Sequence, residues 1–345
     1  MPLYRPESPV PYGRVHEEAL LAASPTDRLR ALLGIRHPVL LAPMAGGPTT
    51  PELVAAVSEA GGLGAFGATG MSAEALAAAV RRARELTDAP IGVNVLLAPP
   101  TQPDPRGRDP HEALAPLRRA LGMRGEPPSP PPASPAADLV QAGLEAGARV
   151  LSVAMGDPAP VVAAARAAGV PLVASATTVA DAERAVASGA DAIVAQGGEA
   201  GGHRSLLDDE GGEIPMVGTL ALVPQVVRAV DVPVIAAGGV MDGRGLAAAL
   251  ALGAAGVQMG TRFLVSAESG APPAYRERVR AARDTDTIIT RAISGRPARG
   301  VRNRLMETLE AAGPPALGWP RQGRAAAALR GAAAAAGDAD AMVLW

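Results

Sequence analysis

One pattern recurs along the chain: a short apolar run, a turn of small residues, and then a stretch with helical periodicity. Buried parallel strands that alternate with covering helices have this form, so the pattern predicts βα units. We count eight apolar runs, which are Val39–Met44, Leu63–Gly67, Ile91–Leu97, Val150–Met155, Leu172–Ala176, Ala192–Gln196, Val234–Ala237 and Gly256–Leu264. Open doubly wound sheets usually stop nearer about six strands, so eight units favour a closed (β/α)8 TIM barrel.

The stretches between these runs support the same fold. The expected helices include Pro51–Ala60, Ala73–Leu86, Ala159–Ala168, Ala180–Ser188, Leu220–Val230 and Gly245–Leu252. Several are followed by a glycine that can close a helix in the left-handed conformation, namely Gly61, Gly169, Gly189 and Gly253. Aromatic residues make up only 2% of the chain. Such small side chains suit helices packed closely on a parallel sheet better than an all-β sandwich.

The expected domain organisation follows from where the pattern starts and breaks. We expect an extended arm over residues 1–23, then a barrel over 24–265 that begins with a short helix capped by Ser24 and ended by Gly34. A proline-rich surface loop with no packing of its own is expected over 98–137, with one helical window at His111–Leu121. Residues 266–320 are expected to form a small subdomain inserted after strand eight, and 321–345 a C-terminal helix that completes the barrel.

Charge and composition exclude several classes of function. The net charge of −2 gives no electrostatic footprint for nucleic acid or an anionic membrane. The chain has no cysteine, which excludes disulfides, zinc-thiolate sites and a cysteine nucleophile. The longest uncharged run, Gly245–Thr261, is about 17 residues, short of the roughly 20 that a membrane span needs. The first residues lack the apolar core of a signal peptide, so we expect a cytoplasmic enzyme.

Active sites of (β/α)8 barrels lie at the carboxyl ends of the strands, which restricts the candidate site residues. The candidates are Met44, Ala45, Gly46 and Gly47 after strand one, Asn94 in strand three, Ser175 and Thr177 near the end of strand five, the segment Gln196–His203 after strand six, Gly238 and Gly239 after strand seven, and Gln258, Met259, Gly260 and Thr261 in strand eight. No pattern of metal ligands, no nucleophile elbow and no P-loop lysine motif is present.

The glycine turns after strands seven and eight predict a phosphate site. Many barrel enzymes bind phosphate between these two loops, where backbone N–H groups point at the anion. The hydroxyl of Thr261 is expected to donate to the same phosphate. The alternative is that Gly238 and Gly239 only allow a tight corner between a strand and a helix.

His203 is the candidate catalytic residue, because it stands at the tip of the glycine-rich segment QGGEAGGHRS and is one of only four histidines. The glycines let the backbone approach a flat ligand, and an imidazole can donate a hydrogen bond or move a proton at physiological pH. The alternative is a surface histidine with no role. Glu199 lies in the same segment, and the sequence allows two roles for it equally: it orients the loop through backbone hydrogen bonds, or it is only solvated.

These motifs together resemble the nitronate monooxygenase family, formerly called 2-nitropropane dioxygenases. The resemblance rests on HPVLLAPMAGG, GVN, QGGEAGGH, IAAGGV, GVQMGTRF and SGRPARGVRNRLM, which occur in this order from about Leu32 to Met306. It implies an FMN-dependent (β/α)8 barrel that oxidises alkyl nitronates with molecular oxygen. It also implies FMN contacts from Asn94, Gln196, Gly201, Gly239 and the segment Gln258–Thr261, a PMAGG turn against the flavin ring, and His203 beside flavin and substrate.

Two related groups define the alternatives. The flavin-dependent enoyl-acyl-carrier-protein reductases share the EAGGH loop and the glycine turns, so an NAD(P)H-dependent reductase of enoyl thioesters or quinones stays open, as does a non-catalytic flavin-binding partner protein. Inosine monophosphate dehydrogenase needs a cysteine nucleophile, which this chain lacks. Many members of the nitronate monooxygenase family carry a lysine near the end of strand five, where this sequence reads VASATT. The expected partners are a nitronate and molecular oxygen, with no nucleic acid, membrane or metal.

Overall fold

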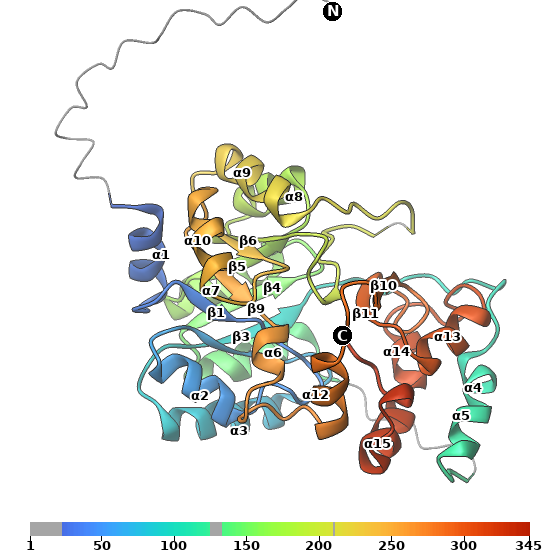
Figure 1. Ribbon diagram of the computed structural model, residues 1–345. Helices are drawn as coiled ribbons and strands as arrows, with labels where there is room; N and C mark the ends of the chain where they lie inside the picture. Colours follow the sequence, from blue (N-terminus) through green and yellow to red (C-terminus); the bar gives the residue numbers. More distant parts are fainter. Residues whose placement is uncertain (1–22, 125–132, 210) are drawn as a thin grey trace, which may run out of the picture.

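Eight parallel strands form one closed sheet in the computed structural model, which describes residues 23–124, 133–209 and 211–345. The strands are β1 (Val39–Leu41), β2 (Gly64–Gly67), β3 (Ile91–Leu96), β4 (Val150–Ala154), β5 (Leu172–Ala176), β6 (Ala192–Gln196), β8 (Val234–Ala237) and β9 (Gly256–Met259). They lie in the order β1-β9-β8-β6-β5-β4-β3-β2, and a parallel bridge between Leu40 and Leu63 joins the two ends. The predicted (β/α)8 barrel is therefore confirmed (Figure 1).

Helices cover the outer side of the sheet. They are α2 (Pro51–Glu59), α3 (Ala73–Leu86), α6 (Ala136–Glu145), α7 (Ala159–Ala168), α8 (Val179–Ala187), α9 (Thr219–Ala229) and α10 (Gly243–Ala251). Side chains of Thr50, Ser72, Thr178 and Asp242 cap four of them. The sequence prediction did not include α6, which directly follows the proline-rich run.

The short helix α1 (Pro25–Leu33) closes the amino-terminal end of the barrel. Ser24 caps it, and Gly34 ends it with φ of 68°, both as predicted. Its buried Leu29 and Leu33 pack in the inner cluster that also contains Leu40 and Val150. This end of the barrel is therefore filled with apolar side chains, which leaves the carboxyl ends of the strands for a site. Almost all of the expected arm, residues 1–22, lies outside the described residues.

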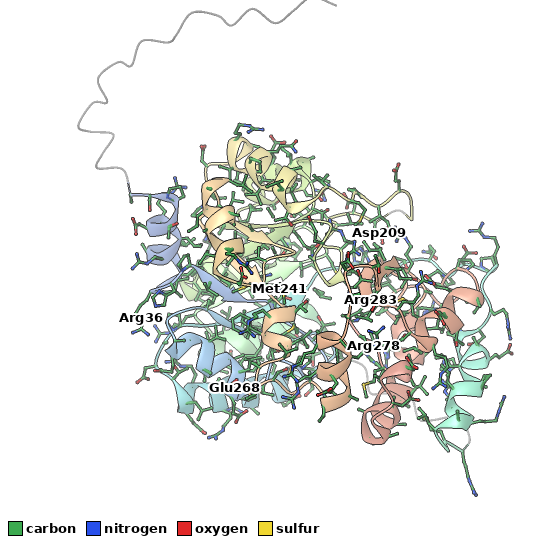
Figure 2. The ribbon with its side chains drawn as sticks, viewed as in Figure 1. Arg36, Asp209, Met241, Glu268, Arg278 and Arg283 are labelled. Atoms are coloured by element: carbon green, nitrogen blue, oxygen red, sulfur yellow. The ribbon has the colours of Figure 1, made fainter. Side chains whose placement is uncertain are left out.

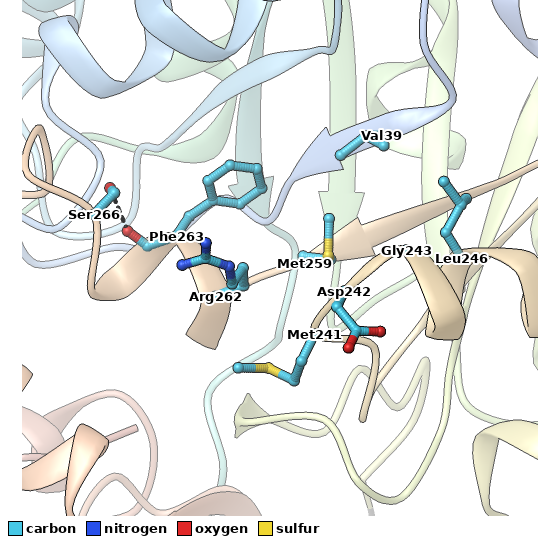
Figure 3. A pocket seen from close by; sticks show the side chains of 9 residues that line it. All are labelled: Val39, Met241, Asp242, Gly243, Leu246, Met259, Arg262, Phe263 and Ser266. Atoms are coloured by element: carbon cyan, nitrogen blue, oxygen red, sulfur yellow. Dashed lines mark hydrogen bonds between the residues drawn. The ribbon is translucent and has the colours of Figure 1, made fainter.

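The eighth apolar run is not one strand. β9 ends at Met259, and Thr261–Leu264 forms the short helix α11, because Gly260 leaves the extended conformation and its carbonyl accepts from the N–H of Phe263 at 2.9 Å. The chain then leaves the barrel. A pocket of about 410 Å³ lies on this flank, lined by Val39, Met259, Phe263 and Leu246 among others (Figure 3). In the described part of the chain, no long helix fills this space between β1 and β9.

A second lobe packs beside the barrel. It contains α4 (Pro110–Ala113), α5 (Ala115–Ala120), α12 (Pro273–Arg280), α13 (Arg304–Ala311), α14 (Arg321–Ala325), α15 (Ala327–Ala336), the turn η2 (Ala339–Ala341), and a small sheet of β10 (Thr287–Thr290), β11 (Ala298–Val301) and β7 (Gly202–His203). Figure 1 shows α4 and α5 next to α13 and α14, which lie far away in the sequence.

The described part of the proline-rich segment has packing of its own, contrary to our expectation. Leu114 and Leu117 are buried against Leu305 and Leu309 of α13. The expected window His111–Leu121 divides into α4 and α5 at Leu114, since Pro116 has no N–H with which to continue the helix. The proline run itself, residues 125–132, lies outside the described residues.

The C-terminal segment also packs in the second lobe. Leu329 and Ala333 of α15 are fully buried, and they belong to the two apolar clusters of this lobe and not to those of the barrel. The expected limits of the domains otherwise stay a prediction. Among the described residues, no helix combines the length and the apolar character needed to cross a membrane.

Candidate functional site

The histidine at the tip of the glycine-rich segment lies on a strand that joins the two lobes. Gly202 and His203 form β7, which pairs antiparallel with β11: His203 is opposite Ala298, and Gly202 is opposite Arg299. The sequence prediction had only a loop here. Because β6 ends at Gln196, β7 carries the imidazole over the carboxyl ends of the barrel strands, where barrel enzymes have their sites.

The side-chain amide of Gln196 holds this strand in place. Its Nε2 donates to the carbonyl of His203 at 2.9 Å, and its Oε1 accepts from the N–H of Ser205 at 2.9 Å. The hydroxyl of Ser205 in turn accepts from the N–H of Met155 at 3.1 Å, after β4. Gln196, predicted as a cofactor contact, thus positions the backbone of His203, and its contact with a cofactor stays a prediction.

Two charged side chains, those of Arg204 and Glu199, fix the glycine-rich segment by hydrogen bonds. Arg204 is 1% exposed, and its Nη1 donates to the carbonyl of Gly197 at 2.6 Å. Burial and the nearby charge of Arg299 lower the pKa of Arg204 to about 10, so it remains a cation at neutral pH. The carboxylate of Glu199 accepts from the N–H of Thr219 at 2.9 Å and from its hydroxyl at 2.8 Å. Glu199 therefore orients the segment against α9.

The imidazole of His203 contacts three side chains of the second lobe. Its Nε2 lies 2.9 Å from the hydroxyl oxygen of Ser294. The ring of Trp319 meets it edge-on with centroids 5.3 Å apart, and the ring of Trp345 lies tilted at 5.4 Å. These are the two tryptophans of the sequence.

The hydrogen bonds of Ser294 favour one tautomer of His203, with the proton on Nε2. The hydroxyl has one proton, and it donates this proton to the carbonyl of Arg296 at 3.1 Å while accepting from the N–H of Arg296 at 3.3 Å. All three bonds are made at once only if Nε2 of His203 carries a proton and donates to Ser294. Nδ1 then carries the lone pair.

His203 is neutral at physiological pH. Its partly buried ring loses solvation, and the positive charge of Arg296 disfavours a second cation, so the pKa falls from 6.5 to about 4. A neutral imidazole can accept a proton or a hydrogen bond at Nδ1, but it supplies no positive charge.

The glycine turns after β8 and β9 offer free donors. Gly238 and Gly239 have φ of 110° and 73°. Within the described residues, neither their N–H groups nor that of Gly260 donate a hydrogen bond. The segment that carries His203 lies close to these turns at Gly201. A Cβ atom added to Gly201 would lie 3.8 Å from Oγ1 of Thr261. This arrangement fits a phosphate bound by backbone N–H groups.

The turn after β1 borders open space. Met44 and Ala45 lead into Gly46 and Gly47, both with positive φ, and a carbon added at either glycine would meet no atom within 4 Å. Such a turn can lie close to a flat ring.

The predicted residues on the strands divide between the two faces of the sheet. Gln258 is paired with Leu40 of the inner cluster and so faces inward. Met259 is paired with Leu41, which packs with Leu53 of α2 in the cluster between the strands and the covering helices, and it lines the flank pocket. Asn94 is buried, with Nδ2 donating to the hydroxyl of Ser152 at 3.0 Å. Only the backbone of Met259 remains available to a ligand inside the barrel.

In the described part of the structure, neither candidate of strand five makes a hydrogen bond with the histidine. Thr177 is fully buried, and its hydroxyl donates to Asp181 of α8 at 3.1 Å. Ser175 contributes its carbonyl, which accepts from the hydroxyl of Ser205 at 3.4 Å. Among the described residues, no three His, Asp or Glu side chains form a group that could hold a metal ion.

Sequence reasoning did not identify Ser294, Arg296, Trp319 or Trp345 as site residues. Ser294 and Arg296 lie in the block SGRPARGVRNRLM, which was noted only as part of the resemblance. The signal for the tryptophans was their rarity in a chain with 2% aromatic residues.

Comparison with known proteins gives consistent results. Residues 26–345 match the family model described as nitronate monooxygenase. The chain is similar to the nitronate monooxygenase of Pseudomonas aeruginosa, with 43% identity over 93% of this chain and 92% of the relative. It is also similar to a probable nitronate monooxygenase of Staphylococcus saprophyticus, with 38% identity over 93% of this chain and 91% of the relative. A solved structure of nitroalkane oxidase from Streptomyces ansochromogenes superposes with a TM-score of 0.80 at 38% identity, covering 92% of this chain and 90% of that one.

Proposed function

Since this chain belongs to the nitronate monooxygenase family, we propose that it uses FMN to oxidise alkyl nitronates with molecular oxygen, and that His203 is its catalytic residue. Members of the family are flavoenzymes. The observation that carries the proposal is the neutral imidazole of His203, held over the barrel by Gln196 and Ser294 beside glycine N–H groups that have no other acceptor.

The residues present fit FMN. The N–H groups of Gly238, Gly239 and Gly260 would hold its phosphate, together with the hydroxyl of Thr261. The turn of Met44, Ala45 and Gly46 and the inward side chains of Asn94 and Gln258 would border the flavin ring, with Gly201 closing the opposite wall. When bound, FMN supplies the electron transfer between the nitronate and oxygen.

The protonation state of His203 favours a nitronate over a neutral nitroalkane. A base with a pKa of about 4 is unprotonated at neutral pH, but it has little driving force to remove a proton from carbon. A nitronate has already lost that proton. The imidazole then has to orient the substrate but does not have to act as a strong base. The residues around it would exclude water.

Oxidation of neutral nitroalkanes is the second candidate. It is supported by the tautomer of His203, whose Nδ1 has a free lone pair that can accept the α-proton. The two candidates differ in substrate only, so initial rates with a nitronate and with its parent nitroalkane, both at neutral pH, separate them.

Replacement of His203 tests the proposal. In His203→Ala, we expect FMN to remain bound with its yellow colour and nitronate turnover to fall by at least about a hundredfold, because the group that orients the substrate is lost. A variant that keeps its turnover would remove His203 from the mechanism.

Anaerobic stopped-flow measurements test the reaction itself. Rapid bleaching of the flavin by a nitronate, and none by NAD(P)H, is the expected result. Bleaching by NAD(P)H with no response to a nitronate would favour the reductase, and FMN binding with no response to either would favour a non-catalytic partner protein.

A further inference from the structure

A nitronate needs a cation that His203 does not provide. The imidazole is neutral, and its one N–H is engaged by Ser294. The sequence contains no lysine, so all 32 of its Lys plus Arg residues are arginines. Any side chain that offsets the charge of a bound anion at neutral pH is therefore an arginine, which keeps its proton in proteins. This inference rests on the proposed function.

Most arginines near His203 are already engaged. Arg204 donates to carbonyl groups of the glycine segment, and Arg299 donates to the carbonyl of Gly198 at 3.0 Å and to the hydroxyl of Thr287 at 3.0 Å. Arg291 forms an ion pair with Asp209 at 2.6 Å. Their donors bind backbone carbonyl groups, a hydroxyl or a carboxylate.

Arg296 differs from these arginines. Its side chain is 1% exposed, and Nη2 donates to the carbonyl of Pro99 at 3.1 Å, just after β3. Nη1 and Nε are buried and have no hydrogen-bond acceptor among the described residues. Buried donors without an acceptor are costly, and a charged group costs more than a neutral one.

The carboxylate nearest to Arg296 does not neutralise it. The side chain of Asp209 is 2% exposed, and its Oδ2 lies 4.0 Å from Nη1 of Arg296, while Nη1 of Arg291 binds the same oxygen at 2.6 Å. Burial opposes the ionisation of Asp209, but the hydrogen bond from Arg291 and the two positive charges lower its pKa overall. The charge of Asp208 also acts on Arg296, but Arg184 binds that carboxylate at 2.5 Å. The three guanidinium groups and two carboxylates of this cluster leave one net positive charge. Figure 2 shows Asp209 where the barrel loops meet the second lobe.

The backbone of Arg296 is linked to the catalytic residue. Its N–H and carbonyl both bind the hydroxyl of Ser294, and the same hydroxyl binds Nε2 of His203. The guanidinium then extends toward Pro99 at the carboxyl end of β3. We propose that Arg296 is the positioning residue that stabilises negative charge beside His203, and that the anion placed there is the planar nitro group of the nitronate.

Nitrate is a suitable probe, because it is a planar anion and undergoes no turnover. In the FMN-loaded full chain, we expect nitrate to perturb the flavin spectrum and to compete with a nitronate. Arg296→Met should weaken nitrate binding by about tenfold, and Arg296→Lys should keep most of it because the charge remains. Arg280→Met is the matched control, since Arg280 is an exposed arginine of α12. This variant should bind nitrate with the same affinity as the unmodified protein.

A second readout does not depend on turnover. Titration of the His203 ring by NMR should give a higher pKa in Arg296→Met than in the unmodified protein, and an unchanged pKa in Arg296→Lys and Arg280→Met. The charged groups on the segments around the ring are Arg204, Arg291, Arg296, Arg299, Glu199, Asp208 and Asp209, with Arg184 bound to Asp208. Of the variants named, only Arg296→Met removes the charge that acts on His203.

Asp209→Asn keeps the inference testable if Arg296→Met does not fold. Removing the carboxylate raises the net charge of the cluster, so nitrate should bind more tightly and the pKa of His203 should fall further. Unchanged nitrate affinity and an unchanged pKa of His203 in either folded variant would overturn the role of Arg296. If nitrate binds as expected but no nitronate is oxidised, the proposed function fails while the assignment of the charge stands.

Discussion

His203 and Ser294 are 91 residues apart in the sequence, yet Nε2 of the imidazole and Oγ of the serine lie 2.9 Å apart. The hydroxyl of Ser294 makes all three of its hydrogen bonds only when Nε2 donates to it, so this serine favours the tautomer of His203 with the proton on Nε2. The histidine comes from the barrel and the serine from the second lobe.

Ser294→Ala should lower nitronate turnover by about tenfold to a hundredfold, because the imidazole loses its fixed tautomer and orientation. FMN affinity should not change, since in the described part of the chain no hydrogen bond joins Ser294 to the glycine turns after β8 and β9. Steady-state kinetics and flavin fluorescence measure the two quantities. Ser294→Thr keeps a hydroxyl and should recover part of the turnover; if Thr and Ala variants are equally slow, the hydrogen bond is not the cause.

Gly238→Ala should weaken both the fold and FMN binding. The residue has φ of 110°, and an added carbon would lie 2.9 Å from the backbone nitrogen of Ala200 and 3.0 Å from Oγ1 of Thr219. We expect a loss of about 1–3 kcal/mol in the free energy of unfolding and a higher Kd for FMN. Gly331→Ala, in α15 with no atom within 4 Å, is the control and should be neutral or slightly stabilising. Equal behaviour of both variants would contradict the prediction.

Gln196→Leu should loosen the strand that carries the histidine. The change leaves the carbonyl of His203 and the N–H of Ser205 without their partners, at a cost of about 2 kcal/mol. Hydrogen exchange of residues 202–205 should accelerate, and urea denaturation should give the lower stability. Gln225→Leu is the control: Gln225 is exposed and binds only the carbonyl of Ala221, one helical turn earlier. Unchanged exchange at residues 202–205 would show that the amide does not hold β7.

The stability of the FMN-free protein should depend on pH through His203. Its pKa is lowered to about 4 in the folded state, so between about pH 4 and pH 6.5 the unfolded chain binds the proton and the folded chain does not. The free energy of unfolding is therefore highest, with respect to this histidine, above about pH 6.5. It falls by up to about 3 kcal/mol as the pH falls toward about 4. Urea denaturation at both ends of this window, compared with His203→Gln, isolates the effect. If His203→Gln loses as much stability as the unmodified protein between about pH 6.5 and about pH 4, the pKa of His203 is near its usual value.

The barrel could be predicted from the sequence because its signals are local. Each strand is an apolar run of a few residues, most of the covering helices have a side-chain cap or a closing glycine, and Ser24 and Gly34 mark the ends of α1. Candidate site residues followed from the same reasoning, since the end of a parallel strand indicates which residues face the site.

A subdomain after strand eight was expected, but its contacts with the proline-rich segment and with His203 could not be predicted, because they are not local. Leu114 and Leu117 are buried only because α13 lies against them, and Ser294 meets His203 only because β11 pairs with β7. The direction of Met259 required the register between β1 and β9, which an isolated apolar run does not specify.

The pairing of β7 with β11 also sets an order of events during synthesis. A ribosome that has made the chain as far as Met259 has supplied all eight strands of the barrel, along with His203. The partner strand of the histidine and Ser294 do not yet exist at that moment. The barrel can begin to form as it emerges, but the imidazole gains its neighbours only after dozens more residues have been added, so the growing chain carries its scaffold before it carries an active site.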